Sequence, residues 1–217
     1  MLVVSPHGDD ETLGAGGTLL RFKKEGHKIY WLNFTDKKQE YGYSAQDTQL
    51  RTRQMKDVVK AYSFDGLYNL GLKPAGLNEN KKNEIIEEIT NIFKTIKPSI
   101  LILPFKNDVH SDHRYVFETV YSCTKIFRAP FIKKILMMEV LSETDFASSD
   151  KGFVPNYFVD ISNYLDKKIK IMRYYQGEMG KHPFPRSEEN IRALAVHRGA
   201  TAGCRYAEAF MLIKGIW

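Results

Sequence analysis

The feature that most constrains the fold of this sequence is an alternation of short apolar runs with helical patterns. Residues Met1–Ser5 form an apolar run that contains two adjacent valines and ends at Pro6, which predicts a short buried strand. The spacing of apolar residues predicts a helix over 13–24, and a second apolar run predicts a strand over 28–35. Because strand, helix and strand in this order build neighbouring parallel strands, the opening of the chain predicts a parallel sheet covered by helices.

The same alternation continues along the chain. The clearest helix is expected over 81–97, where isoleucine and phenylalanine recur at three- and four-residue spacings before Pro98. A continuous apolar run over 99–103 predicts a buried parallel strand. The other expected strands are 67–70, 135–141 and 157–161, and the other expected helices are 47–62, 112–127, one capped by Ser162 that runs to about Tyr175, and one opened by Ser187. The pattern is strong over 1–128 and weaker afterwards.

Length and composition indicate one folded domain. At roughly 150 residues per domain, 217 residues suffice for one compact unit, which we expect to span 1–217. Hydrophobic residues make up 43% of the chain, enough for a core and too many for a disordered protein. The net charge of +6 is compatible with an anionic substrate, a lipid headgroup layer, nucleic acid, or simply a solvated surface.

The cysteine count and the start of the chain bear on its location. Two cysteines cannot build a disulfide framework, which weakly indicates a reducing compartment. No apolar run approaches the roughly 18 residues of a membrane span. The chain opens on Met1 without a basic stretch followed by a long apolar region, so we expect no secretory signal and a cytoplasmic location.

The first chemically informative segment is His7-Gly8-Asp9-Asp10-Glu11, directly after the first expected strand. In a parallel α/β sheet, ligands bind in loops at the carboxyl ends of the strands. One imidazole and three carboxylates in such a loop are compatible with a solvated turn and also with half of a metal site. Because catalytic zinc usually keeps three protein ligands, a metal site would need another ligand from elsewhere.

The second segment is His110-Ser111-Asp112-His113, which follows the expected strand over 99–103 by a loop. Taken alone, it could be an ordinary helix start with Ser111 or Asp112 as the N-cap. Taken with the first segment, it places two His/Asp clusters at the same edge of the sheet, which favours one shared metal site. Glycines 14, 16 and 17 do not complete a dinucleotide-binding pattern, and close helix packing explains them better. Cys123 is expected to be a buried structural thiol.

These two motifs, in this order and strand context, resemble the zinc-dependent de-N-acetylase family, the LmbE-like or PIG-L-type group that acts on N-acetylglucosamine conjugates. Members show His-Pro-Asp-Asp-Glu in the first loop and His-x-Asp-His in a later one. Gly8 replaces the proline here, which loosens the loop without removing a ligand. The resemblance implies a single-domain, Rossmann-like α/β fold with a mostly parallel sheet, helices on both faces, and the active site at the carboxyl ends of the strands.

Residue by residue, the resemblance implies a metal site and the groups around it. The implied ligands of one Zn²⁺ per chain are His7, Asp10 and His113. Asp9 would be the general base, and His110 the general acid or oxyanion stabiliser, with Asp112 orienting it. Arg53 matches a substrate-binding arginine, although Lys56 stands where an acidic residue is usual.

The implied reaction is removal of an acetyl group from an N-acetylated amino sugar or its conjugate. The alternative is that the same metal site belongs to an amidase that acts on a non-sugar acylated amine. A third hypothesis, a basic binding module without enzymatic activity, rests on the charge alone and would require salt-dependent binding to nucleic acid or anionic vesicles. We expect no nucleic-acid partner and no membrane span. The oligomeric state stays open, a homo-oligomer included.

Overall fold

The computed structural model describes residues 1–216, in which seven strands form one sheet in the order β3-β2-β1-β4-β5-β7-β6. The strands are β1 (Leu2–Ser5), β2 (Tyr30–Thr35), β3 (Gly66–Leu72), β4 (Ile100–Pro104), β5 (Lys134–Met138), β6 (Tyr157–Asp160) and β7 (Ala207–Gly215). Strands β1 to β5 pair in parallel, and β7 runs antiparallel to both β5 and β6. The prediction of a single α/β domain with a mostly parallel sheet is confirmed.

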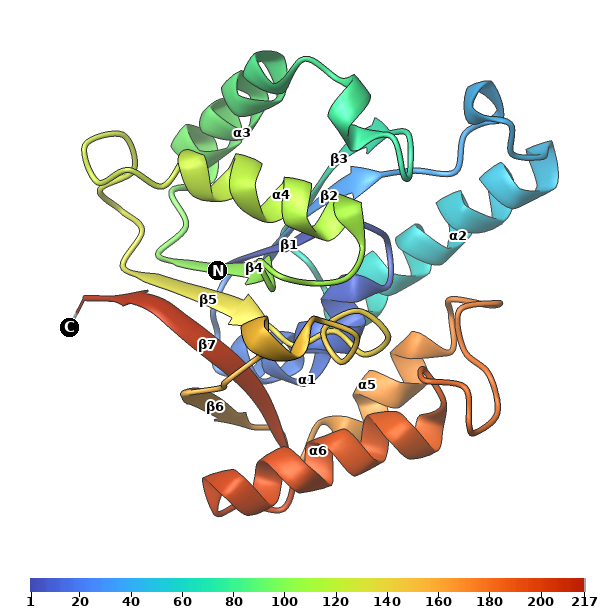
Figure 1. The fold of residues 1–217 in the computed structure, drawn as a ribbon, viewed down its shortest axis with the longest axis vertical. Coiled ribbons are helices and arrows are strands. Elements are labelled where there is room, and N and C mark those ends of the chain that lie inside the picture. The colour runs from blue at the N-terminus through green and yellow to red at the C-terminus, as the bar shows by residue number, and fades with distance from the viewer. Residues whose placement is uncertain (217) are drawn as a thin grey trace.

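Helices cover both faces of this sheet, as Figure 1 shows. The helices are α1 (Asp10–Lys24), α2 (Ala45–Tyr62), α3 (Lys82–Ile96), α4 (Ser111–Ser122), α5 (Leu165–Met172) and α6 (Glu188–Ala202). On one face, α1, α2, α5 and α6 pack their apolar sides over the sheet, and on the other face α3 and α4 do so. The three layers bury an aliphatic core on each side of the strands, which is the main source of stability for such a fold.

Several element boundaries differ from the sequence-based expectation. Helix α1 begins at Asp10, three residues earlier than predicted, because carboxylates in a first turn interact favourably with the helix dipole. The expected Ser162 cap is wrong: α5 begins at Leu165, and the Ser162 hydroxyl donates to Asp160 instead. The Ser187 cap is confirmed, since its side chain accepts from the backbone N–H of Asn190 at 3.1 Å.

Close approach, rather than phosphate binding, explains the glycines of α1. A Cβ atom at Gly14 would lie 2.7 Å from the Met138 side chain, and one at Gly17 would lie 2.6 Å from Ile161. Both positions therefore require glycine for α1 to contact the sheet and the segment before α5. Cys123 is 3% exposed, as expected for a structural thiol.

The strand order reverses between β1 and β4, and this determines where the site lies. From β1 the chain proceeds outward to β2 and β3, and then returns to place β4 on the other side of β1. In open α/β sheets, such a reversal leaves a crevice outside the carboxyl ends of the two strands, where ligands bind. The two polar motifs follow these two strands.

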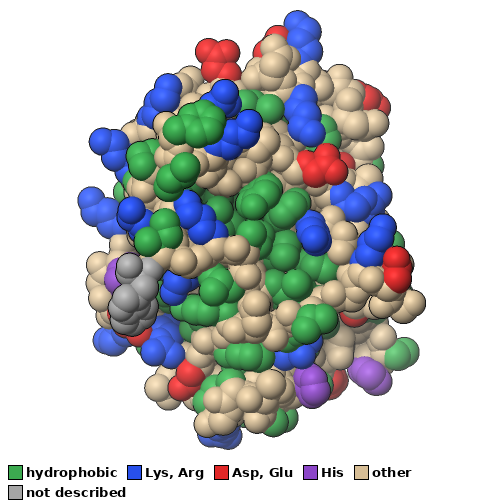
Figure 2. All heavy atoms as spheres, turned by 60° about the vertical axis from the view of Figure 1, so that its left-hand side comes forward, with side chains coloured by type: hydrophobic (Ala, Val, Ile, Leu, Met, Phe, Trp, Pro, Cys, Tyr) green, Lys and Arg blue, Asp and Glu red, His purple; other side chains and the backbone are tan. Residues whose placement is uncertain are grey.

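The opposite side of the molecule has a different surface character. Figure 2, which turns the left-hand side of Figure 1 forward, shows hydrophobic side chains gathered among lysine and arginine side chains, with fewer acidic ones. This side carries the starts of β4 and β5 rather than their carboxyl ends. None of the helices within residues 1–216 is both long and apolar enough to cross a membrane. The expected cytoplasmic location stays a prediction.

Candidate active site and metal centre

The loop after β1 turns directly into α1 and presents its polar side chains at the sheet edge. Asp9 is the N-cap residue of α1, and Asp10 is its first helical residue. The backbone N–H of His7 donates to Oδ2 of Asp10 at 2.9 Å, which closes the turn around that carboxylate. The side chains of His7, Asp9 and Asp10 are thereby held by one short loop, which is fixed by β1 at one end and by α1 at the other.

The second motif begins α4 and brings its side chains to the same edge. His110 is the N-cap residue, and its Nδ1 accepts from the backbone N–H of Asp112 at 3.1 Å. Asp112 and His113 lie in the first turn and are buried, with His113 fully excluded from solvent. The beginning of a helix does not require a histidine N-cap or buried Asp and His side chains in the first turn. We therefore expect His110, Asp112 and His113 to have a functional role.

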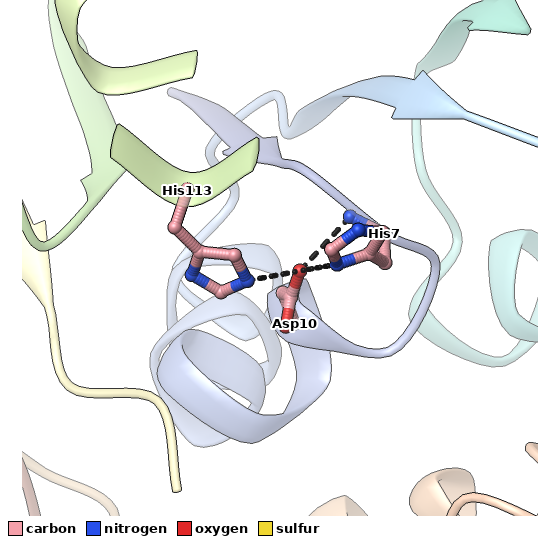
Figure 3. Close-up of side chains that lie close together, drawn as sticks. All are labelled: His7, Asp10 and His113. Carbon is pink, nitrogen blue, oxygen red and sulfur yellow. Dashed lines mark hydrogen bonds and ion pairs between the residues drawn. The ribbon is translucent and has the colours of Figure 1, made fainter. Parts of the chain in front are cut away.

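The two motifs place three donor atoms around one point. His7, Asp10 and His113 each offer a ligand atom, and these atoms lie within 4.8 Å of one another. Figure 3 shows both imidazoles turned toward the carboxylate: Oδ2 of Asp10 lies 3.4 Å from Nδ1 of His7 and 3.3 Å from Nε2 of His113. Within the part of the chain that the structure describes, Nε2 of His113 is buried without a hydrogen-bond partner. A buried, unpartnered imidazole nitrogen beside a carboxylate fits a divalent cation of the zinc type.

A second group of donor atoms, from His7, His110 and Asp112, also lies within 4.8 Å. Its atoms are already engaged with the protein. Oδ2 of Asp112 accepts from the backbone N–H of Ala75 at 2.7 Å and contacts Nε2 of His7 at 3.1 Å. Nδ1 of His110 holds the helix cap. The first group is therefore the better metal site.

Carboxylates behind the two histidines fix their orientation. The Asp112 carboxylate contacts Nε2 of His7, and the backbone N–H of Asp112 donates to Nδ1 of His110. The expected role of Asp112 in orienting His110 stays a prediction. Asp108 contacts Nδ1 of His113 at 2.8 Å and accepts from the Thr144 hydroxyl at 2.6 Å. Carboxylates in this position set the tautomer of a histidine and raise its basicity as a ligand. The sequence analysis missed Asp108, although it stands five residues before His113 in the same polar stretch.

Asp108→Asn should weaken metal binding without unfolding the protein. Loss of the carboxylate leaves Nδ1 of His113 without its negative partner, and changes of this kind cost about 10- to 100-fold in metal affinity. Competition titration with a chromogenic chelator measures the affinity. Thermal unfolding of the chelated protein provides the control, because the two metal-free proteins should have similar transition temperatures. An unchanged affinity would show that Asp108 does not support a ligand.

The acidity of these groups reflects their mutual contacts. Burial alone would lower the pKa of His7, but the carboxylates of Asp10 and Asp112 outweigh it and raise the pKa to about 9. Burial likewise opposes protonation of His113, yet Asp10 and Asp108 raise its pKa well above the ordinary value. The same histidines hold the pKa of Asp10 below its ordinary value, although burial would raise it. The cluster therefore binds positive charge strongly, and a metal ion would compete with protons for it.

Asp9 lies beside this cluster in a different environment. Its Oδ2 atom lies 3.3 Å from Nη1 of Arg186, and its side chain is 5% exposed. Burial, with the neighbouring Asp10 carboxylate, raises the pKa of Asp9 to about 6, and Arg51 and Arg186 oppose the rise. A carboxylate with a pKa near neutral pH can exchange protons readily.

These groups open into a pocket of about 420 Å³. Besides the motif residues His7, Asp9, Asp10 and His110, it is lined by residues from five other segments: Thr35, Asp36, Lys37, Tyr43, Arg51, Pro74, Ala75, Glu143, Glu178 and Arg186. The charged side chains outside the motifs carry both signs. Such a lining suits a polar, hydroxylated substrate better than an apolar one.

The structure does not bring Arg53 to this pocket, which corrects the expectation for that residue. Its side chain is 83% exposed and pairs with Asp57 on the outer side of α2. Arg51 lies in the pocket instead, where it donates to the Gly8 carbonyl and pairs with Glu178 at 2.8 Å. The motif analysis also did not find Glu178 and Arg186, because they come from the loop before α6 and become neighbours of Asp9 only on folding.

Sequence comparison agrees with the geometry. Residues 2–124 match the sequence profile of the family described as PIG-L, GlcNAc-PI de-N-acetylase. A diacetylchitobiose deacetylase of Thermococcus kodakarensis is 23% identical to this chain over an alignment of 224 positions, which covers 100% of this chain and 84% of that protein.

Comparison with solved structures supports the fold. N,N'-diacetylchitobiose deacetylase from Pyrococcus horikoshii, bound to an inhibitor, has a TM-score of 0.76 at 20% identity, with 99% of this chain and 83% of that chain covered. GalB, the 4-carboxy-2-hydroxymuconate hydratase of Pseudomonas putida KT2440, has a TM-score of 0.79 at 13% identity, with 100% and 96% covered. Because one fold serves a deacetylase and a hydratase, the reaction must be argued from the site.

Proposed function

Since this chain belongs to the PIG-L family of de-N-acetylases, we propose that it hydrolyses the acetamide of an N-acetylated amino sugar or its conjugate, releasing acetate and a free amine. The observation that carries the proposal is the convergence of His7, Asp10 and His113 beside Asp9 in one polar pocket. Water attack on an amide needs an electrophile activator, a base and a proton donor, and this pocket contains candidates for each.

One Zn²⁺ held by His7, Asp10 and His113 is the cofactor that we propose. Two imidazoles and one carboxylate are a donor set that zinc accepts in hydrolases, and this set leaves a coordination position open. When bound, zinc polarises the acetyl carbonyl and makes water a stronger acid. The carboxylates of Asp112 and Asp108 hold the two histidines for that purpose.

Asp9 is the proposed general base. It stands next to a proposed ligand, lines the pocket, and belongs to neither group of metal-donor atoms. Arg186 contacts one of its oxygens and leaves the carboxylate able to take a proton from water. Its raised pKa of about 6 gives it the basicity that proton abstraction at neutral pH requires.

His110 is the proposed oxyanion stabiliser. The other role, general acid toward the leaving amine, would require the ring to take up a proton first, and the proton that Asp9 gains from water is one source for it. Because Nδ1 accepts from the backbone N–H of Asp112, the neutral ring carries its proton on Nε2. Burial, together with nearby His7, holds the pKa of His110 below its ordinary value, so the resting ring is neutral at pH 7. Nε2–H can then donate to the carbonyl oxygen as negative charge develops there.

Arg51 is the arginine that we propose for positioning the site. Its guanidinium connects the Gly8 carbonyl in the metal-binding loop to Glu178, and Glu178 also contacts Arg186 at 3.4 Å. These contacts tie the loop after β1 to the loop before α6. The arginine therefore holds the two sides of the pocket at a fixed separation.

Arg51→Ala should lower kcat/KM by about 10- to 100-fold, because each hydrogen bond to a charged group contributes about 1.5–3 kcal/mol. The matched control is Arg53→Ala on the same helix. Its side chain lies in solvent, so activity should change by less than about twofold. Steady-state acetate release by both variants makes the comparison. Equal losses would mean that α2 as a whole, rather than the Arg51 contacts, supports activity.

The decisive experiment is acetate release from a panel of N-acetylated sugars, including N-acetylglucosamine and diacetylchitobiose, with and without a chelator. We expect release that stops on chelation and returns with Zn²⁺, at about one zinc per chain. No release from any sugar would count against the proposal. Faster release from non-sugar N-acetyl amines would favour the amidase alternative. The absence of a nucleic-acid partner stays a prediction, and the oligomeric state stays open.

A further inference from the structure

Glu143 is a carboxylate in the catalytic pocket that neither motif contains. It lies in the turn after β5 and lines the pocket together with His110. Its Oε2 atom is buried and has no hydrogen-bond partner among residues 1–216. The neighbouring residue Thr144 holds Asp108, so the turn itself belongs to the supporting structure of the metal centre.

The other carboxylates that line the pocket are all engaged. Asp9 contacts Arg186, and Asp10 contacts both histidines of the first donor group. Asp36 accepts from the Lys37 backbone and from Asn69, and Glu178 pairs with Arg51, Lys37 and Arg186. Within the described residues, Glu143 is thus the pocket carboxylate that lacks a protein partner.

Metal binding does not explain this carboxylate. Neither group of metal-donor atoms found in residues 1–216 includes Glu143. Burial raises the pKa of Glu143 to about 7, and the positive charge of His113 opposes that rise. A half-buried carboxylate without a donor is unfavourable, so its presence in a folded pocket calls for a partner that arrives from solution.

The backbone before Glu143 is also held in an unfavourable conformation. Ser142 has φ of 71°, and the only other non-glycine residues with positive φ in the described chain are Ser63, Ala75 and Lys97. Ser63 and Lys97 end helices, where this conformation is common. Ala75 and Ser142 instead adjoin the pocket: Ala75 donates to Asp112, and Ser142 precedes Glu143. Unfavourable backbone of this kind clusters where side chains must be aimed at a ligand.

The neighbouring backbone contacts keep Glu143 in place. Its N–H donates to the Val140 carbonyl at 3.2 Å, and its own carbonyl accepts from the N–H of Val109 at 3.2 Å. The second contact joins the turn after β5 to the loop that leads into the His110 motif. The backbone of Glu143 is therefore held beside the proposed reaction centre, which places its side chain at the pocket.

We propose that Glu143 is a specificity-determining residue that accepts hydrogen bonds from ring hydroxyl groups beside the acetamido group of the substrate. This inference rests on the proposed function. The ionised form of Glu143 accepts hydrogen bonds and its protonated form can also donate one, and sugar hydroxyls, which do both, lie near the scissile amide of such a substrate. A pocket built to bind a hydroxyl discriminates strongly against an analogue without it, because its own polar group is then left unpaired.

The test compares two acetamides that differ in their hydroxyl groups. N-acetylglucosamine carries them, and N-acetylcyclohexylamine has a six-membered ring without any. For Glu143→Ala, kcat/KM should fall about 10- to 100-fold on the sugar and change less than about twofold on the cyclohexyl compound. Glu143→Gln, which keeps an acceptor oxygen, should retain part of the activity on the sugar.

A binding measurement makes the test independent of turnover. Calorimetric titration of the zinc-loaded protein with glucosamine should show weaker binding to Glu143→Ala than to the wild type, and titration with cyclohexylamine should show no difference. Metal content should stay unchanged, and the unfolding temperature should not fall, because alanine removes a half-buried carboxylate that has no protein partner within the described residues. Equal losses for both compounds, or no loss for either, would overturn the inference. If the wild type binds glucosamine through Glu143 yet releases no acetate, the proposed function fails while this inference stands.

Discussion

Asp9→Asn should lower kcat by about 10²- to 10⁴-fold while leaving the metal in place, because a positioned general base contributes a factor of that size. Asparagine has the shape of aspartate and can still contact Arg186, but it cannot take a proton from water. Asp9 is separate from the three donor atoms that surround the proposed ion. Single-turnover acetate release, with zinc content measured on the same sample, tests both halves of this expectation.

The adjacent residue supplies the matched control. Asp10→Asn removes the carboxylate that both histidines contact, so this variant should lose zinc together with activity. The two substitutions are identical in chemistry and one position apart, so they separate proton transfer from metal binding. If Asp9→Asn also lost the metal, Asp9 would be a ligand. If it kept wild-type activity, another group would be the base.

The fold was predictable where its strands are buried on both faces. The parallel strands β1, β2 and β4 are fully or mostly buried, so they are continuous apolar runs that sequence patterns detect. Strand β7, which pairs with β5 and β6 in antiparallel orientation, is buried in its first half and partly exposed in its second, so its apolar pattern is less distinct. This explains why the pattern weakened in the second half of the chain.

The helix register explains the one arginine that was assigned to the wrong position. Each residue of an α-helix is rotated by about 100° around the helix axis relative to the residue before it, so residues two apart point in nearly opposite directions. Arg51 and Arg53 therefore cannot face the same pocket, and burial against Gly8 and Glu178 selects Arg51. The motif residues were found because each motif is contiguous. Asp108 and Glu143 were missed because their relation to the metal centre is created by folding.

Glu208, which stands among apolar residues near the end of the chain, is buried in the structure and has several polar partners. Glu208 is 5% exposed, and one of its oxygens accepts from Nζ of Lys168 at 2.7 Å. It also accepts from the backbone N–H groups of Gly17 and Thr18, at 2.8 and 2.7 Å. Nζ of Lys168 donates in addition to the Leu13 carbonyl. The pair thus connects α1, α5 and β7 inside the core on one side of the sheet.

Lys168→Met should therefore destabilise the protein by about 3–5 kcal/mol, because removing one partner leaves a buried charge without its counterion. Glu208→Gln should also destabilise, and the double variant should lose less than the sum of the two, since both charges are then gone. Urea unfolding measures all three. The exposed pair Lys81–Glu84 provides the control, for which Lys81→Met should have a much smaller effect. Additive losses in the double variant would show that Lys168 and Glu208 stabilise the fold separately. A non-additive result would show that the Lys168–Glu208 ion pair holds α1, the helix of the metal-binding motif, against β7. In this way a contact far from the pocket supports the pocket.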